Sequence, residues 1–337
     1  MSTSQLSAPS AAESQPRSAA REGGTPGGAD SGSGPRRRTR RVSAAPYLFL
    51  VPFFSLFGLF MAYPIVNAIS TAFRDATLTG AKGWTGFDNF TSIAADPLFQ
   101  AAAINTAFFV AVSLGVIFPV SLLLALAVRP AWIIGGPVVR ILLITAAVVV
   151  PVVSAIVFQI ILGQAGLLNS TILALNPTYQ PIDWLNDPTW ARWGVALMFV
   201  WHWTGFTMIY FVSGLANVSR ELEESASVDG ANGWQTFWAV TWPQLHAIRV
   251  LVLVLIIQGS AQIFDEPRII AGWMGAGPEN SLITMTMYVY EKAFGEANSG
   301  EANAAALLLL TAIVVGIGLV LLTGRDPALP KREKRSR

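Results

Sequence analysis

The sequence predicts an all-α membrane protein with six transmembrane helices. Of its 337 residues, 53% are hydrophobic and only 12% are charged, with a mean hydropathy of +0.52. A typical soluble domain carries about twice that share of charge. Six apolar stretches are long enough to cross a bilayer as helices. They cover approximately residues 46–70, 103–128, 138–162, 194–214, 248–271 and 303–323.

Before the first stretch, residues 1–44 form a tail of a different kind. Ser, Ala, Gly and Pro dominate its first 34 residues, which lack apolar periodicity and are predicted to be disordered. Five arginines between positions 36 and 41 close the tail. The following apolar stretch is too long for a secretory signal, and no other feature supports a nucleic-acid-binding arm. The basic run is therefore interpreted as a cytoplasmic anchor.

The distribution of basic residues orients the six spans. Seventeen of the 22 Lys and Arg residues fall in the two tails and the connections on the same side, against five on the opposite side. Because cytoplasmic segments carry the excess of Lys and Arg, both tails are predicted to be cytoplasmic. The predicted organisation is an N-tail (1–44), a six-helix membrane domain (45–323) and a basic C-tail (324–337).

Three segments of about thirty residues are predicted on the outer side: 72–102, 163–193 and 272–302. Turn-forming pairs such as Asp96-Pro97 and Gly277-Pro278 punctuate them. Their tryptophans fit an interfacial aromatic belt, or, taken together, a compact outer surface that docks a partner. None of the three segments is long enough to be a separate domain.

The spans contain few residues that can carry chemistry. Away from the ends of the spans, His202 is the one His, Asp, Glu, Lys or Arg residue, with Asp265, Glu266 and Arg268 near the outer end of the fifth. An ion-coupled carrier usually needs such groups near the bilayer midplane. Two histidines and no cysteine are too few for a metalloenzyme, and no nucleophile motif occurs.

None of the four lysines follows a glycine, so the chain lacks a P-loop. We therefore expect no catalytic, cofactor-binding or metal-binding residues, and any ATPase to be another polypeptide.

The loop of residues 217–245 on the cytoplasmic side is unusual. Ser219 is a candidate N-cap, and three glutamates in the following turn complement the helix dipole. This short helix should stop at Asp229-Gly230. A second helix would place Trp234, Phe237, Trp238 and Thr241 on one face, and Pro243 fits poorly in a helix interior. The pattern predicts a helix–turn–helix elbow. It either lies on the membrane surface or under the helix bundle, or fits a groove on a soluble partner.

Residues 224–231, Glu-Ser-Ala-Ser-Val-Asp-Gly-Ala, followed by Pro243-Gln-Leu245, resemble the EAA loop of ABC-importer permeases. The resemblance is closest to the carbohydrate-uptake branch, which includes the maltose and glycerol-3-phosphate permeases. Ser225 and Trp242 are mild departures from the family's usual Ala and Leu. Further segments of this chain, spread over most of residues 46–323, also resemble motifs of the family. They are Gly86-Phe-Asp-Asn-Phe90, Asn105-Thr106, Gly166-Leu-Leu-Asn169 and Trp184-Leu-Asn-Asp-Pro188.

The resemblance implies a type I ABC importer permease fold in the cell membrane, with cytoplasmic EAA coupling helices. It implies a heterodimer with a second homologous permease, two copies of a cytoplasmic ATPase that bind ATP and Mg²⁺, and an extracytoplasmic binding protein that delivers a sugar-like solute. Membrane lipid, but no nucleic acid, completes the expected partners. The residues implied in ATPase coupling are Glu224, Ala226, Asp229, Gly230, Ala231, Trp234, Phe237, Trp238 and Pro243.

Two helices flanking the loop offer candidate groups for the solute path, since sugars favour aromatic faces and neutral hydrogen-bonding groups. These candidates are Phe199, His202, Trp203, Phe206, Tyr210, Gln258, Gly259, Ser260 and Gln262. Alternatively, the aromatic stripe packs helices together and Gly259 permits their close approach. A single-chain secondary carrier and a structural scaffold remain as other functions. The sequence does not identify the sugar or polyol.

Overall fold

The computed structural model describes residues 45–77, 79–129, 145–272 and 275–323. The predicted tails 1–44 and 324–337 therefore lie outside the described residues, as do Trp273 and the start of the predicted third span. The chain divides into two units, residues 1–54 and 55–337. The described part of the first unit belongs to helix α1 (Ala45–Phe57), and its large apolar side chains from Leu48 to Phe54 are exposed.

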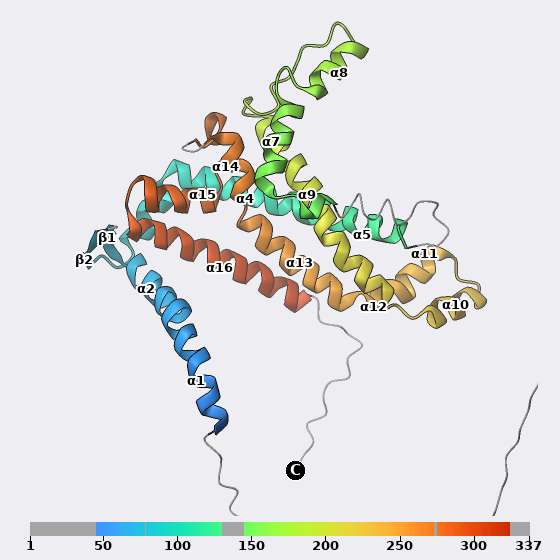
Figure 1. Cartoon of the computed structure of the whole chain (residues 1–337), viewed down its shortest axis with the longest axis horizontal. Helices are drawn as coiled ribbons and strands as arrows, with labels where there is room; N and C mark the ends of the chain where they lie inside the picture. Colours follow the sequence, from blue (N-terminus) through green and yellow to red (C-terminus); the bar gives the residue numbers. More distant parts are fainter. Residues whose placement is uncertain (1–44, 78, 130–144, 273–274, 324–337) are drawn as a thin grey trace, which may run out of the picture. The chain divides into compact units, whose positions relative to one another are not determined.

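In the described residues, six helical stretches are long and apolar enough to cross a membrane (Figure 1). Their bounds are Leu48–Ala72, Pro97–Ala127, Pro151–Leu175, Ala191–Ala216, His246–Ala271 and Ser299–Thr323. After α1 they contain the π-helical turn η1 (Gly58–Ala62), α2 (Tyr63–Ala72), α4 (Pro97–Val112), the π-helical turn η2 (Ser113–Ile117), α5 (Phe118–Ala127), α7 (Pro151–Leu162), α8 (Leu167–Leu175), α9 (Ala191–Ala216), α13 (His246–Ala261), α14 (Asp265–Ala271) and α16 (Ser299–Thr323).

The second span begins earlier than the apolar stretch predicted. Pro97, not a residue near 103, is its first residue, because Asp96 caps the helix: its Oδ1 accepts the Leu98 N–H at 2.9 Å. Proline suits the first helical position, where its missing N–H costs nothing. The Asp96-Pro97 pair, predicted as a turn, is therefore a helix start.

The third span also differs from the prediction of 138–162. Helix α7 ends at Leu162 as expected, but residues 138–144 lie outside the described part of the chain. A second helix, α8, follows after Gly163 and Gly166, inside a segment predicted as an external loop. A Cβ at Gly166 would lie 2.6 Å from the Ile160 carbonyl oxygen, so only glycine allows the chain to turn this tightly before α8.

Three π-helical turns precede an aromatic–proline pair: Tyr63-Pro64, Phe118-Pro119 and Trp242-Pro243. In each, the aromatic N–H bonds the carbonyl five residues earlier, for example from Trp242 to Phe237. Proline lacks an N–H, and its ring clashes with the carbonyl four residues back. The wider turn moves this carbonyl aside, and the helix continues through the proline.

The core of the second unit lies where α4, α5, α9 and α13 meet. Its largest buried side chains include Phe109, Phe199, Phe211 and Met208. Helix α13 also packs along α16, and α16 packs against α2 and α15 (Met285–Tyr290), as Figure 1 shows.

Short elements connect the spans on the predicted outer side. An antiparallel hairpin of β1 (Arg74–Thr77) and β2 (Gly80–Trp84) precedes α3 (Asp88–Ala95). Between the fifth and sixth spans lie a 3₁₀ turn, η4 (Pro278–Asn280), then α15 and the π-helical turn η5 (Glu291–Gly295).

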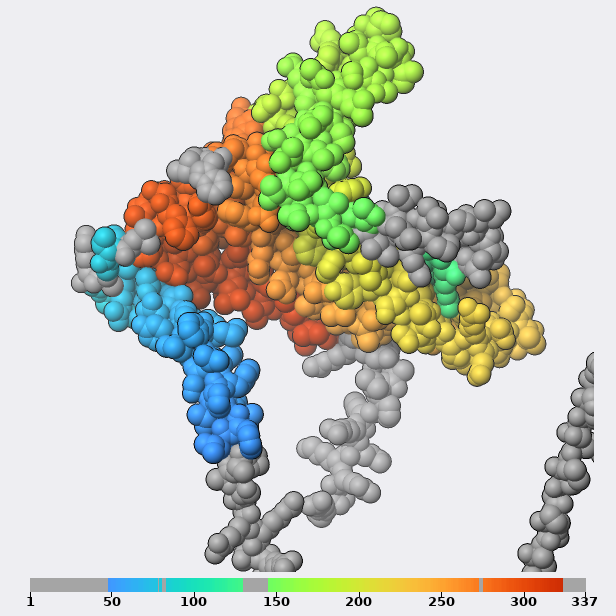
Figure 2. All heavy atoms as spheres, in the orientation of Figure 1, coloured from blue at the N-terminus to red at the C-terminus, as the bar shows by residue number. Residues whose placement is uncertain are grey.

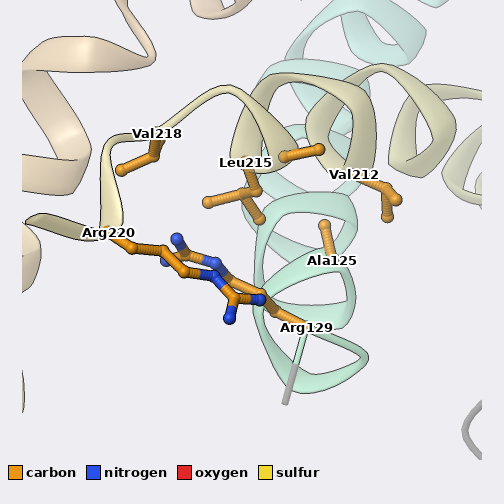
Figure 3. Close-up of a pocket in the computed structure, with 7 residues that line it drawn as sticks. Ala125, Arg129, Val212, Leu215, Val218 and Arg220 are labelled. Atoms are coloured by element: carbon orange, nitrogen blue, oxygen red, sulfur yellow. The ribbon is translucent and has the colours of Figure 1, made fainter. Parts of the chain in front are cut away.

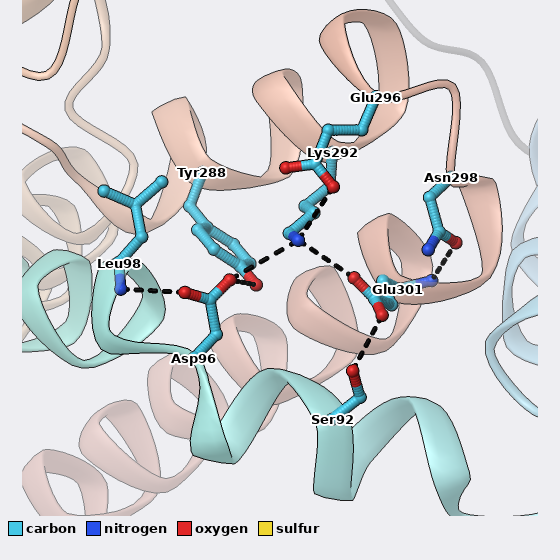
Figure 4. A network of polar contacts seen from close by, with 8 residues as sticks. All are labelled: Ser92, Asp96, Leu98, Tyr288, Lys292, Glu296, Asn298 and Glu301. Carbon is cyan, nitrogen blue, oxygen red and sulfur yellow. Dashed lines mark hydrogen bonds and ion pairs between the residues drawn. The ribbon is translucent and has the colours of Figure 1, made fainter.

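Lys292 holds these outer elements together (Figure 4). Its Nζ lies 2.9 Å from Glu296, 3.0 Å from Glu301 and 3.4 Å from Asp96. Tyr288 also donates to Asp96 at 2.8 Å. Burial opposes the charge on Lys292, but the carboxylates of Glu296 and Glu301 outweigh it and raise its pKa. The cluster thereby joins the start of the second span to the start of the sixth.

Asn169 organises the other large outer segment. Its amide donates to the carbonyls of Gly163, Gln164 and Ile182, and its Oδ1 accepts from Tyr179 and Trp184. Two motifs that were noted separately in the sequence, Gly166–Asn169 and Trp184–Pro188, therefore meet at one buried amide.

Candidate functional site

The elbow, residues 217–245, consists of α10 (Arg220–Val228), α11 (Gly233–Thr236), the π-helical turn η3 (Phe237–Thr241) and α12 (Trp242–Gln244). The predicted helix start and stop are both confirmed. The Ser219 hydroxyl accepts the Leu222 N–H at 3.4 Å, and α10 ends at Val228 with Asp229 as its C-cap.

The turn after α10 is a complete C-capping motif. Gly230 has φ +88°, and its N–H bonds the Ser227 carbonyl at 3.1 Å. The Ala231 N–H bonds the Ala226 carbonyl at 2.9 Å. This pair of bonds defines the Schellman motif, in which a glycine takes the left-handed conformation. Three residues of the EAA resemblance, Ala226, Gly230 and Ala231, therefore build the turn itself.

The next helix is capped at once. Asn232 Oδ1 accepts the Gln235 N–H, and Gln235 Oε1 accepts the Asn232 N–H, both at 2.9 Å. This reciprocal capping box follows the Schellman turn with one residue between Gly230 and the cap. The short connection between the two helices is thus fixed from both ends by local hydrogen bonds.

The second helix of the elbow does not place all four predicted side chains on one face. The π-helical turn η3 ends at Thr241 and shifts the register before Pro243. Trp234, Phe237, Trp238 and Trp242 make consecutive ring contacts with centroids 5.2 to 6.3 Å apart. Thr241, predicted on the same stripe, is buried and points to α10 instead.

Glu223 joins the elbow to the membrane helices. Its carboxylate accepts two hydrogen bonds from Arg129, at 2.7 and 2.9 Å, and one from the Thr241 hydroxyl at 2.8 Å. Burial raises the pKa of Glu223, but the bonds from Arg129 and Thr241 outweigh this and lower it overall. Gln244 joins the end of the elbow to its start, because its Oε1 accepts the Ser219 N–H at 3.1 Å.

Four large apolar side chains of the elbow are exposed. Val228 is 88% exposed, Trp234 70%, Leu222 53% and Trp238 46%. Glu224 and Asp229 are also exposed, and neither forms a side-chain hydrogen bond or ion pair with another described residue. The elbow lies at the surface of the face in Figure 2, in yellow to light orange. A rigid element that leaves its large apolar side chains in solvent is typical of a surface that docks a partner.

The candidate solute-path residues lie on α9 and α13, with Gln262 as the C-cap of α13. Phe199, Trp203, Phe206 and Tyr210 form one continuous row of tilted and edge-to-face ring contacts along α9, with centroids 5.3 to 5.5 Å apart. The Trp203 ring occupies the space that a Cβ of Gly259 would need, so Gly259 permits the close approach of α9 and α13.

The polar candidates fall into two groups. Ser260 is buried, and its hydroxyl donates to the Ile256 carbonyl of its own helix. Gln258 and Gln262 are exposed, and Nδ1 of His202 has no partner among the described residues. Gln258 and Gln262 are therefore the polar candidates on this surface, whereas Nδ1 of His202 is buried.

Glu266 and Arg268 are buried in α14, at the C-terminal end of the fifth span. Arg268 lies 3.8 Å from Glu291. Within the described residues, no three His, Cys, Asp or Glu side chains cluster as metal ligands.

The family described as "Binding-protein-dependent transport system inner membrane component" matches residues 34–326. The chain belongs to this family. It is 33% identical, over 82% of its length and 88% of the relative, to the arabinooligosaccharides transport system permease protein AraP of Bacillus subtilis (strain 168). It is 29% identical to the lactose transport system permease protein LacF of Rhizobium radiobacter, over 74% and 83% of the two chains.

The fold of this family member also resembles a solved structure. It superposes, with a TM-score of 0.73 and 22% identity, on a chain of a bacterial ABC transporter involved in the import of the acidic polysaccharide alginate. The match covers 84% of this chain and 96% of that chain. The predicted permease fold with six membrane helices is thus confirmed.

The residues that hold the elbow in place were not predicted from the sequence. Arg129 follows the end of α5, and Gln244 stands beside Pro243, but nothing in their spacing connects them to Glu223 or Ser219. A single arginine directly after an apolar span, opposite a run of glutamates, is the available signal for the first pair.

Proposed function

We propose that the chain is one of two transmembrane subunits of an ATP-driven importer of a sugar or related polyol. A separate ATPase, present in two copies, drives the movement through the elbow, and an extracytoplasmic binding protein delivers the solute. A second homologous permease completes the path. The named relatives are permeases for arabinooligosaccharides and lactose, and the alginate importer has also been solved in complex with an alginate pentasaccharide-bound periplasmic protein.

The elbow is the observation that carries this proposal. Force can pass from a soluble partner into membrane helices only through an element that keeps its shape. Two consecutive caps fix the turn, and Glu223 ties α10 to Arg129 at the end of α5. The exposed Trp234 and Trp238 supply a surface for a groove on the partner. The excess of basic residues in the tails supports placing both tails and the elbow in the cytoplasm.

A transport assay with the complete importer in liposomes tests the coupling role. Gly230→Pro is incompatible with φ +88° and removes the Gly230 N–H bond to Ser227. Asp229→Lys reverses the charge beside it. Both variants should insert normally and lose solute uptake per ATP hydrolysed. Gly233→Ala is the matched control, because nothing lies within 4 Å of a Cβ there. Normal coupled uptake in either variant would refute the coupling role.

The solute path has its own test. Gln262→Ala removes an exposed polar group at the end of α13 and should reduce uptake while the complex stays assembled. Trp203→Ala should also reduce uptake, but it leaves a void over Gly259, so its thermal stability must be measured alongside. Unchanged uptake in Gln262→Ala would exclude this side chain from the path.

A further inference from the structure

A pocket with two arginines lies between the C-terminal ends of α5 and α9 and the start of the elbow. Its volume is about 380 Å³, and Figure 3 shows the residues that line it. Ala125, Val212, Leu215 and Val218 give it an apolar wall. Arg129 and Arg220 reach into the same end of the pocket from different elements. The pocket is therefore amphipathic, with an apolar wall and a cationic end.

The charges at this end are only partly compensated. The Glu223 carboxylate accepts two hydrogen bonds from Arg129, and the other N–H groups of that guanidinium remain available as donors. Arg220 forms no ion pair with any described residue. Glu221 and Glu224 stand on the same helix, but, unlike Arg220, neither of them lines the pocket. Two guanidinium groups around one Glu223 carboxylate leave an excess positive charge.

The position of the pocket along the membrane spans indicates the kind of anion that it binds. The apolar wall belongs to the last turns of two membrane spans, which end at Ala127 and Ala216. Arg129 and Arg220 follow these ends by two and four residues, so they stand at the level of the lipid headgroups. Basic pockets at the ends of transmembrane helices bind lipid phosphates, and a guanidinium group matches phosphate geometry through paired hydrogen bonds.

We propose that this pocket binds the phosphate group of an anionic phospholipid from the leaflet on the elbow side. The phosphate bridges Arg220 and the free donors of Arg129, and the start of an acyl chain lies along Val212 and Ala216. The lipid then contacts the arginine that holds Glu223, so membrane composition acts on the attachment of the elbow. Assigning this leaflet to the cytoplasm rests on the proposed function, whereas the binding itself does not.

Native mass spectrometry of the full-length chain, purified with its partner subunits and delipidated, tests the proposal. Phosphatidylglycerol should bind in preference to phosphatidylcholine. Arg220→Gln should weaken this binding about tenfold or more, as expected for the loss of one charged hydrogen-bonding group. Ala216→Phe fills the pocket while both arginines remain, and it should have the same effect. Arg74→Gln, on the exposed hairpin, is the charge-matched control and should bind as the wild type does.

Three results would overturn the proposal. Phosphatidylglycerol binding that is unchanged in both Arg220→Gln and Ala216→Phe would place the lipid elsewhere. Equal binding of phosphatidylcholine would remove the role of the anionic headgroup. Thermal stabilisation by inorganic phosphate alone, lost in Arg220→Gln and not matched by phosphatidylglycerol, would identify a site for soluble phosphate. Because binding is measured without transport, loss of import in a variant does not affect these readouts.

Discussion

The elbow and the outer cluster around Lys292 are both polar regions beside the membrane helices, but they are built in opposite ways. In the elbow, the two caps bond residues three to five positions apart. In the outer cluster, Tyr288 and Asp96 are 192 positions apart, and Ser92 and Glu301 are 209 apart. The elbow therefore holds its own shape, whereas the outer cluster holds separate spans together.

This difference separates stability from coupling. A variant of the outer cluster should destabilise the whole membrane domain, because it removes contacts between the second and sixth spans. A variant of the elbow should leave the membrane domain folded and alter its attachment to a partner. The two regions can therefore be distinguished by measuring thermal unfolding and coupled uptake on the same variants.

The largest expected effect is that of Lys292→Met. Its side chain is only 11% exposed and faces three carboxylates. Removing the cation leaves these carboxylates to repel one another, and we expect a loss of about 3 kcal/mol. Thermal unfolding in mild detergent should show a midpoint several degrees lower. Lys292→Arg keeps the charge and should recover most of the loss. An unchanged midpoint in Lys292→Met would show that the cluster does not join the spans.

Arg129→Gln should have the next largest effect, but a local one. Glu223 would keep only the Thr241 hydroxyl, at a cost of about 1–2 kcal/mol for the attachment of α10. Hydrogen exchange should accelerate at the amides of α10 and α11, and coupled uptake should fall, with little change in the unfolding midpoint. Thr241→Val, which removes the other bond to Glu223, should give a weaker form of the same result. Equal exchange in Arg129→Gln and wild type would contradict this attachment.

Acid pH should weaken the outer cluster through Asp96. Burial raises the pKa of Asp96, but the bonds from Tyr288 and the Leu98 N–H, together with the charge of Lys292, lower it overall. A carboxyl whose folded-state pKa is depressed stabilises the protein above its unfolded pKa of about 3.9, and this contribution is lost as the pH falls further. As the pH falls below about 4, the midpoint temperature of unfolding should therefore decrease. The decrease should be less steep in Asp96→Asn. Identical slopes would exclude Asp96 as the titrating group.

The same contrast explains what the sequence could predict. The six spans, the Ser219 cap and the stop at Asp229-Gly230 depend on composition and on neighbours a few positions apart, and the structure confirms them. The start at Pro97 was missed because Asp96-Pro97 fits a turn and a helix start equally well. Helix α8 was missed because its apolar residues follow two glycines inside a segment rich in turn signals.

Contacts between residues far apart in the chain leave no local pattern in the sequence from which they could be predicted. Lys292 stands two residues before Phe294 in a segment with several charges, and nothing local indicates that Asp96 lies beside it. The π-helical turn η3 likewise changed the predicted aromatic face, because the proline that induces it lies after the stripe rather than in it. Thr241 consequently faces Glu223 instead of joining the tryptophans.

The smallest expected effect gives the sharpest test of the elbow, because two glycines three residues apart require opposite outcomes. Gly230 has φ +88°, where alanine costs about 1 kcal/mol, whereas Gly233 begins α11 in open space and its replacement by alanine should stabilise the helix slightly. Gly230→Ala should accelerate hydrogen exchange across residues 226–236 and reduce coupled uptake; Gly233→Ala should slow exchange and leave uptake intact. Matching effects of the two substitutions would mean that coupling does not depend on the left-handed turn. Opposite effects, with unchanged unfolding midpoints, would show that the glycine of the Asp-Gly pair acts through its backbone conformation.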